Sequence, residues 1–253
     1  MTATITGVPT SLSEASAQAG QATTAALDDG LTRLQVSLML PGLKGETFAA
    51  QMITILLGTG RSLKVFFPDM GAAALAKRNW GDVPFEILDV GSGRTPVGKR
   101  VAYQDELLLF VEPSAVEVLQ VDELCNQAGD RPVIFLNPNL EDIATIGIGY
   151  AGRQLRERFL TQLQDVYYLS PDDGYVVSRC YPNVWQVWGE PQVEGADYVL
   201  LGERSQRPTG DVLDGILMGT AGEEGEGEGD TPAAMPKRSI LDQMQRFLQA
   251  LSR

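Results

Sequence analysis

The sequence of 253 residues contains no histidine and only two cysteines, Cys125 and Cys180. Histidine is the commonest general base and metal ligand near neutral pH, so its absence removes most nucleophile relays and imidazole metal sites. Two isolated cysteines provide neither a disulfide framework nor a zinc motif. We therefore expect buried, reduced thiols and no resident cofactor or metal. The same absences favour a protein that is not an enzyme.

Long apolar runs are also missing. No run reaches the length of about 18 residues that a membrane-spanning helix needs. Residues 1–20 lack the basic start and apolar core of an export signal, and they are too poor in arginine for an organelle transit peptide. These absences predict a cytoplasmic protein without a transmembrane segment.

Basic residues are the minority, with 20 Lys and Arg against 33 Asp and Glu, for a net charge of −13. A nucleic-acid partner is excluded, because phosphate binding needs a basic surface. Residues 223–236 carry only acidic charges, whereas residues 237–253 have four basic residues and one acidic residue. The sign of the charge therefore reverses near the C-terminus, and any other anion site must be local.

Short apolar runs alternate with helical patterns along most of the chain. Continuous runs such as Leu107–Val111 are typical of strands buried on both faces of a parallel sheet. After residue 165 the runs become aromatic and β-branched and are separated by Pro, Asp, Asn and Gly, which predicts hairpins. The fold class is therefore α/β, with a mixed, largely parallel sheet flanked by helices and antiparallel hairpins in the C-terminal part. The predicted strands are residues 31–38, 63–67, 85–88, 107–111, 132–136, 166–169, 175–180, 184–188 and 198–201.

Helix boundaries follow from capping patterns. Ser11 and Glu14 have the spacing of a capping box, and Gly30 can end the alanine-rich helix that follows. Further helices are predicted over residues 44–58, from Asp69 to about residue 81, and after the second capping box that begins at Ser114.

The predicted domain organisation has four parts. Residues 1–9 form a flexible leader, and residues 10–204 form a single α/β domain. Residues 205–236 contain the run EEGEGEGD, whose like charges and low apolar content predict a linker, with one or two helical turns left open at residues 212–218. Residues 237–253 form an amphipathic C-terminal helix.

The segment GIGYAGRQLRERFL at residues 147–160 has the glycine spacing G-x-G-x-x-G before a predicted helix. Two features count against a dinucleotide site: residues 143–146 make a poor preceding strand, and Pro171 interrupts the following one. A simpler anion site at the helix N-terminus remains open. Its candidate residues are Gly147, Gly149, Gly152, Arg153 and Arg156.

Helical geometry distinguishes the three arginines of this segment. At 100° per residue, Arg156 falls within the face defined by Leu155 and Phe159, Arg153 lies at its edge, and Arg158 faces solvent. A buried guanidinium needs a carboxylate, carbonyl groups or a bound anion. An internal salt bridge and an anion site both satisfy Arg156.

Three predicted strands end in similar residues, Asp69, Glu112 and Asn137, each beside a proline. In a parallel sheet these side chains meet at the carboxyl edge, where open α/β sheets bind ligands. They form a candidate pocket that could hold Mg²⁺, although their spacing is not a metal motif. The alternative is that the prolines merely start helices and end strands.

The C-terminal helix has one narrow apolar stripe opposite its arginine and glutamine residues. The stripe can dock on its own domain, on another subunit, on a partner protein or on an anionic membrane surface. The partner-helix candidates are Ile240, Leu241, Met244, Phe247, Leu248 and Leu251.

Four segments together carry a family resemblance. They are RPVIFLNPNLED at residues 131–142, GYAGRQLRERFL at 149–160, YYLSP at 167–171 and RCYPNVW at 179–185. Over about residues 9–202 the chain resembles an uncharacterised domain family shared by cyanobacteria and plant plastids. The best-known plastid members of that family are named for low accumulation of photosystem II.

The resemblance implies a non-enzymatic accessory factor that acts by protein–protein contact in photosystem or thylakoid biogenesis. It implies a photosystem subunit or assembly factor as partner, and a cytoplasmic location with peripheral contact at the thylakoid membrane. The alternative function is a nucleotide- or phosphate-binding protein or enzyme with an anion site at residues 147–156. A third possibility is a homo-oligomer assembled through the C-terminal helix.

Overall fold

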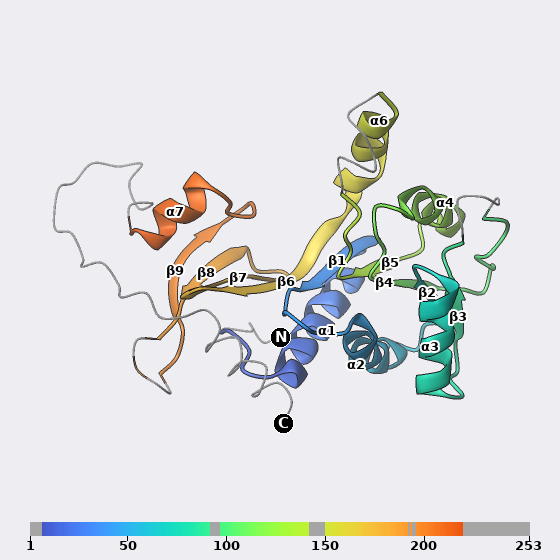
Figure 1. Ribbon diagram of the computed structural model, residues 1–253, viewed down its shortest axis with the longest axis horizontal. Coiled ribbons are helices and arrows are strands. Elements are labelled where there is room, and N and C mark those ends of the chain that lie inside the picture. Colours follow the sequence, from blue (N-terminus) through green and yellow to red (C-terminus); the bar gives the residue numbers. More distant parts are fainter. Residues whose placement is uncertain (1–6, 92–96, 142–149, 192, 194–195, 220–253) are drawn as a thin grey trace.

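The computed structural model describes residues 7–91, 97–141, 150–191, 193 and 196–219 (Figure 1). Most of the expected leader, the acidic run and the whole C-terminal helix therefore lie outside the described residues. The same holds for Gly147, Gly149 and the strand considered at residues 143–146.

The described residues form a nine-stranded mixed sheet in the order β3-β2-β4-β5-β1-β6-β7-β8-β9. The six strands from β3 to β6 run parallel, and β7, β8 and β9 continue the sheet as antiparallel hairpins. This arrangement confirms the predicted α/β class. The strands are β1 (Arg33–Leu38), β2 (Leu63–Phe67), β3 (Glu86–Asp89), β4 (Leu107–Val111), β5 (Val133–Leu136), β6 (Gln164–Asp172), β7 (Tyr175–Cys180), β8 (Trp185–Gly189) and β9 (Val199–Arg204).

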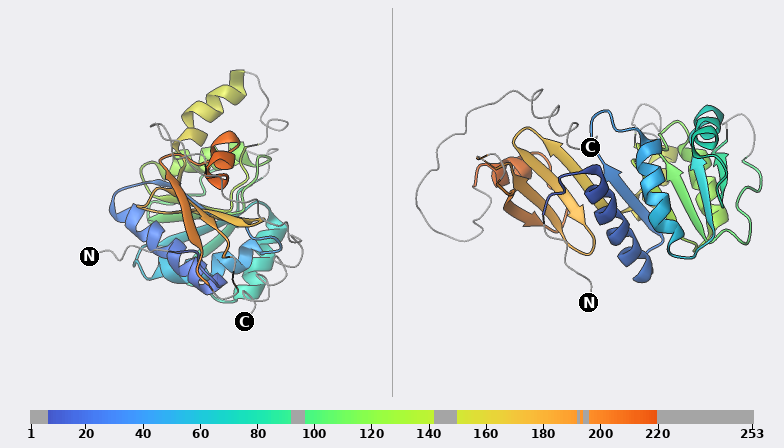
Figure 2. Two further views of the ribbon diagram at one scale, coloured as in Figure 1. Left: turned by 90° about the vertical axis from the view of Figure 1, so that its left-hand side faces the viewer. Right: turned by 90° about the horizontal axis from the view of Figure 1, so that it is seen from below.

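Helices cover both faces of the sheet (Figures 1 and 2). On one face lie α1 (Leu12–Asp28), α2 (Gly45–Leu57) and α3 (Met70–Trp80), which share one apolar core with the sheet. On the other face lie α4 (Val118–Ala128), α6 (Tyr150–Arg158), the short 3-10 helix η1 (Leu160–Gln162) and α7 (Asp211–Leu217). Figure 1 shows α6 and α7 well apart on this second face.

Aromatic rings fill the second core. Phe66, Phe110 and Phe135 come from the neighbouring strands β2, β4 and β5, and consecutive ring centroids are 4.9 and 5.3 Å apart. Phe159, just after α6, meets Phe135 edge-on at 6.2 Å. The row therefore anchors the end of α6 to the centre of the sheet.

Helices α1 and α2 approach each other closely at Gly20. A Cβ atom at Gly20 would lie 2.5 Å from Cδ1 of Ile55, so only glycine fits this position without displacing the isoleucine. The Ser11 side chain caps α1 by accepting the Glu14 N–H, which confirms the predicted helix start. Helix α1 in turn covers β1 and β6.

Strand boundaries agree with the sequence where apolar runs are continuous, as in β2 and β4. Pro171, expected to interrupt a strand, instead lies inside β6 and pairs with Val176. The described pairing of β1 with β6 ends at Leu169, so the missing N–H of Pro171 leaves no gap in that ladder.

Ordered structure continues past Arg204, where the domain was expected to end. Helix α7 lies over β8 and β9, and its Ile216 is buried against Gly202. A seven-residue helix with one buried side chain gives little periodic signal, which explains why this segment resembled a linker.

Both cysteines are free and buried, as expected. Burial raises the pKa of Cys125 to about 12 and that of Cys180 to about 11, so neither thiol is poised as a nucleophile. Within the described part of the chain, no helix is long and apolar enough to cross a membrane.

Candidate functional site

The carboxyl edge of the parallel sheet brings Glu112 and Asn137 side by side, because Val111 and Leu136 are paired in the register of β4 and β5. Asp69 follows β2 at the same edge. Glu112 and Asn137 both have left-handed backbone conformations, with φ of 49° and 45°. Such conformations cost energy in residues other than glycine, so this turn is held by its surroundings.

Each of these three side chains bonds to backbone groups. Asp69 accepts the Ala72 N–H at 2.9 Å and caps α3. Asn137 continues the ladder beyond β5, since its Oδ1 accepts the Leu38 N–H at 2.7 Å and its Nδ2 donates to the Leu38 carbonyl at 3.3 Å.

The Glu112 carboxylate accepts the backbone N–H of Gly45 at the start of α2. Burial nevertheless dominates and raises the pKa of Glu112. All three carboxyl-edge residues therefore have structural partners. Among the described residues no group of three or more His, Cys, Asp or Glu side chains is arranged to hold a metal ion. A pocket at this edge stays a prediction.

Helix α6 carries the described part of the candidate anion site. Arg153 is exposed and Arg156 is half-buried, whereas Gly152 is buried. The ion pair of this helix is made by Arg158, whose Nη1 donates to Oδ1 of Asp122 on α4 at 3.1 Å. The salt bridge between α6 and α4 is thus made by the exposed Arg158, whereas the sequence predicts a salt bridge or an anion site at Arg156 and places Arg158 in solvent. The anion site itself stays a prediction, because its first two glycines lie outside the described residues.

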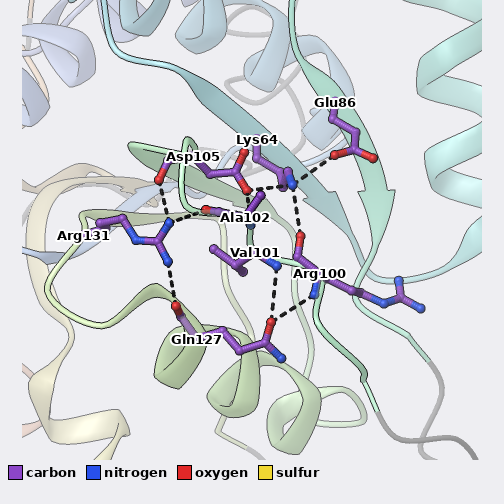
Figure 3. A network of polar contacts seen from close by, with 8 residues as sticks. All are labelled: Lys64, Glu86, Arg100, Val101, Ala102, Asp105, Gln127 and Arg131. Carbon is purple, nitrogen blue, oxygen red and sulfur yellow. Dashed lines mark hydrogen bonds and ion pairs between the residues drawn. The ribbon is translucent and has the colours of Figure 1, made fainter.

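A buried polar network lies at the opposite, amino edge of the sheet (Figure 3). Lys64 is only 4% exposed. Its Nζ lies 2.7 Å from the Asp105 carboxylate and 3.0 Å from that of Glu86, and it donates to the Arg100 carbonyl at 3.0 Å. Burial acts to lower the pKa of Lys64, but the hydrogen bonds and charges of the two acids outweigh it and raise the pKa.

Arg131 completes the network by donating to four main-chain carbonyls, of which those of Ala102 and Asp105 belong to the loop before β4 (Figure 3). A shallow, open cavity of about 500 Å³ is lined in part by Arg61, Glu106 and Arg131. Because the Arg131 fork is occupied by carbonyls, the network fixes the loop to α4 and leaves few free donors for a ligand.

Exposed apolar side chains gather at the far end of the antiparallel hairpins. Strand β9 has three in succession, and among the described residues it pairs only with β8, so its other edge is open. Further exposed apolar side chains come from α7 and the residue after it. We call this group the β9 edge surface; its residues are Val199, Leu200, Leu201, Val212, Leu217 and Met218.

A cluster of arginines and aromatic rings lies on the second face of the sheet. Tyr168, Arg179 and Trp185 are directly opposed on β6, β7 and β8, so their side chains share one face. The Tyr168 and Trp185 rings are 5.2 Å apart. Arg207, from the segment between β9 and α7, places its Cζ 4.1 Å from the Tyr168 ring centroid and donates to the Tyr168 hydroxyl.

Sequence patterns predicted neither the β9 edge surface nor the cluster of arginines and aromatic rings. Three members of the cluster, Tyr168, Arg179 and Trp185, stand in the YYLSP and RCYPNVW segments, but strand patterns do not reveal which strands pair. Arg207 fell in the presumed linker. For the β9 edge surface, a signal was available in the apolar run that closes the last predicted strand.

A model of a family described as a domain of unknown function, DUF1995, matches residues 9–215. The match begins just before α1 and extends through β9 into α7, so it covers nearly all of the described fold. The chain therefore belongs to this uncharacterised domain family, DUF1995.

Proposed function

We propose that this protein is a non-enzymatic accessory factor that acts by protein–protein contact through the β9 edge surface. The observation that carries the proposal is the open edge of β9 with Val199, Leu200 and Leu201 exposed in succession. Folded proteins normally protect such edges with charges, prolines or a covering element, because an open strand invites pairing. An edge kept open and apolar suits a surface that is covered by a partner.

A partner segment can bind here as an added strand. Its main chain would pair with the edge of β9 that no described strand covers, and its side chains would cover the apolar residues on both faces. Helix α7 extends the contact with Val212 and Leu217, which are exposed beside the strand. Buried apolar area supplies affinity, and backbone pairing sets the register.

The partner that we propose is a photosystem subunit or assembly factor, met at the surface of the thylakoid membrane. Support comes from the resemblance to proteins of cyanobacteria and plastids that are named for low accumulation of photosystem II. The acidic surface also suits contact with a protein better than contact with nucleic acid, since the net charge is −13.

A matched pair of positions tests the contact. Leu200 on β9 and Leu75 on α3 are 42% and 43% exposed, so a change at either position perturbs a similar surface. A photo-crosslinking amino acid is placed at each position in the full chain, which is then incubated with solubilised thylakoid membranes. Photosystem II subunits or their assembly factors should cross-link from position 200 and not from position 75.

Lysine at the same two positions provides the functional comparison. Leu200→Lys should lower photosystem II accumulation in a photosynthetic cell that depends on this chain, whereas Leu75→Lys should not. Equal cross-linking from both positions would contradict the proposal. Cross-linking of position 200 only to a second copy of the chain would replace it with self-association through β9.

A further inference from the structure

Two guanidinium groups share one aromatic platform on the second face of the sheet. The Cζ atoms of Arg179 and Arg207 lie 5.6 and 5.8 Å from the centroid of the same Trp185 ring. One arginine comes from β7 within the sheet, and the other comes from the segment after β9. Strand pairing and chain reversal therefore bring together two cations that are separated in sequence.

Neither arginine forms an ion pair with a described residue, although the chain has 33 acidic and 20 basic residues. Like charges repel, and partial burial removes the water that would screen them. The Trp185 ring stabilises both cations and the Tyr168 ring stabilises Arg207, but neither ring neutralises a charge. The cluster therefore holds an excess of positive charge on an otherwise acidic protein.

Asp165 is an acidic residue whose pKa is raised by burial and lowered in part by the charges of both arginines. It lies on β6 on the same face, opposite Gln35 of β1, and the charges of Arg207 and Arg179 both act on its carboxyl group. Its Oδ1 and the Nε of Arg179 are buried atoms for which the described residues provide no hydrogen-bond partner. The one Asp165 carboxyl group is acted on by two guanidinium groups, and its Oδ1 and the Arg179 Nε remain available for hydrogen bonding.

We propose that Arg179 and Arg207 bind the anionic group of a small organic ligand, a carboxylate or a phosphate, above the Tyr168 and Trp185 rings. Nη2 of Arg207 donates to the Tyr168 hydroxyl, and the remaining N–H groups of the two guanidinium groups match the oxygen atoms of either anion in a bidentate geometry. Arg207 is exposed and can adjust to the ligand, whereas half-buried Arg179 is fixed by the sheet. Asp165 opposes anions of high charge and favours a ligand that also offers a hydrogen-bond donor.

This site shares no residue with the β9 edge surface. The platform residues Tyr168 and Trp185 are buried, so the ligand contacts the arginines more than the rings. A small ligand suits this arrangement because the Cζ atoms of both arginines lie 5.6 and 5.8 Å from the centroid of one Trp185 ring.

Trp185 provides a direct readout in the full-length chain. Inorganic phosphate and succinate are titrated to about 10 mM while the indole N–H resonances of Trp80, Trp185 and Trp188 are followed by NMR. A saturable shift of Trp185 with Trp80 unchanged is expected, and the probe with the lower dissociation constant identifies the favoured anion. Absence of a saturable Trp185 shift with both probes would overturn the proposal.

Two arginine variants that each remove one positive charge distinguish binding at this site from a general effect of the protein's net charge. Arg207→Gln should weaken binding at least about tenfold, because it removes a charge-assisted contact. Arg78→Gln, on the exposed last turn of α3, should leave binding unchanged. Asp165→Asn should strengthen binding by removing the opposing carboxylate. Equal weakening by the two arginine variants, with melting temperatures retained, would also overturn the proposal.

Discussion

The carboxylate of Glu112 occupies the space that a Cβ atom of Gly45 would fill. A methyl group at Gly45 would lie 2.1 Å from Cδ of Glu112, far inside van der Waals contact. The carboxylate comes from the end of β4 and accepts the N–H of Gly45 in the first turn of α2. Lys44, the N-cap residue, makes no side-chain cap, so Glu112 supplies the missing acceptor from another element.

Gly45→Ala should therefore destabilise the protein by about 1–3 kcal/mol, because the methyl group displaces the carboxylate. Alanine normally favours a helix over glycine by about 1 kcal/mol. In a Glu112→Ala background the clash is gone, and the same substitution should become neutral or stabilising. Urea unfolding of the four proteins in this cycle measures the coupling, and additive effects would show that the contact is absent.

The buried network at the amino edge predicts unequal roles for the two acids that meet Lys64. Asp105 is buried, whereas the side chain of Glu86 is 57% exposed. Asp105→Ala leaves the buried ammonium short of a partner and should cost about 3 kcal/mol of unfolding free energy. Glu86→Ala should cost at most about 1 kcal/mol, since solvent screens that pair. Chemical denaturation measures the unfolding free energy of both variants. Equal losses would show that Asp105 and Glu86 contribute equally to holding Lys64.

Asp165 predicts a specific dependence of stability on pH. Burial raises the pKa of Asp165 above its ordinary value of 3.8, and Arg207 and Arg179 offset this only in part. The folded protein thus holds this proton more tightly than the unfolded chain. The resulting stabilisation is complete below about pH 3.8 and is lost as the pH rises through the folded-state pKa.

Asp165→Asn should consequently gain melting temperature relative to the unaltered protein as the pH rises from about 4 to 7. Asp173→Asn, in the exposed turn between β6 and β7, serves as the control and should show no such trend. Thermal unfolding at several pH values provides the measurement. A constant difference between Asp165→Asn and the unaltered protein would contradict the raised pKa.

Local patterns predicted most elements of the sheet because their information lies within a few residues. The run Leu107–Val111 is apolar throughout, and a strand buried on both faces requires that pattern. The carboxyl edge followed from the parallel arrangement, so the convergence of Glu112 and Asn137 could be predicted as well. Their hydrogen bonds could not, since they depend on backbone groups of Gly45 and Leu38.

Long-range partners explain the remaining differences. Arg158 was placed in solvent from its helical angle, and it is exposed, but its guanidinium also reaches Asp122 on α4. A helical wheel describes one helix and contains no information on its neighbour. Arg207 likewise meets Tyr168 only after the chain has formed three hairpins, and no spacing rule connects them.

The boundary of the domain can be tested at α7. Ile216 is buried, and its Cγ2 would lie 3.1 Å from a Cβ atom at Gly202, so α7 fits closely over β9. Ile216→Ala should cost about 2–4 kcal/mol of unfolding free energy if this helix belongs to the cooperative fold. Its neighbour Leu217 is exposed, and Leu217→Ala should stay within about 0.5 kcal/mol.

The unfolding profile distinguishes a domain helix from a linker helix. In a linker, α7 would open independently, and Ile216→Ala would leave the urea midpoint of the sheet unchanged. In the domain, loss of the isoleucine lowers the midpoint with an unchanged slope, because the same surface is exposed on unfolding. The family match, which extends to residue 215, favours the second result. A stable fold after α7 is removed would place the boundary back at β9.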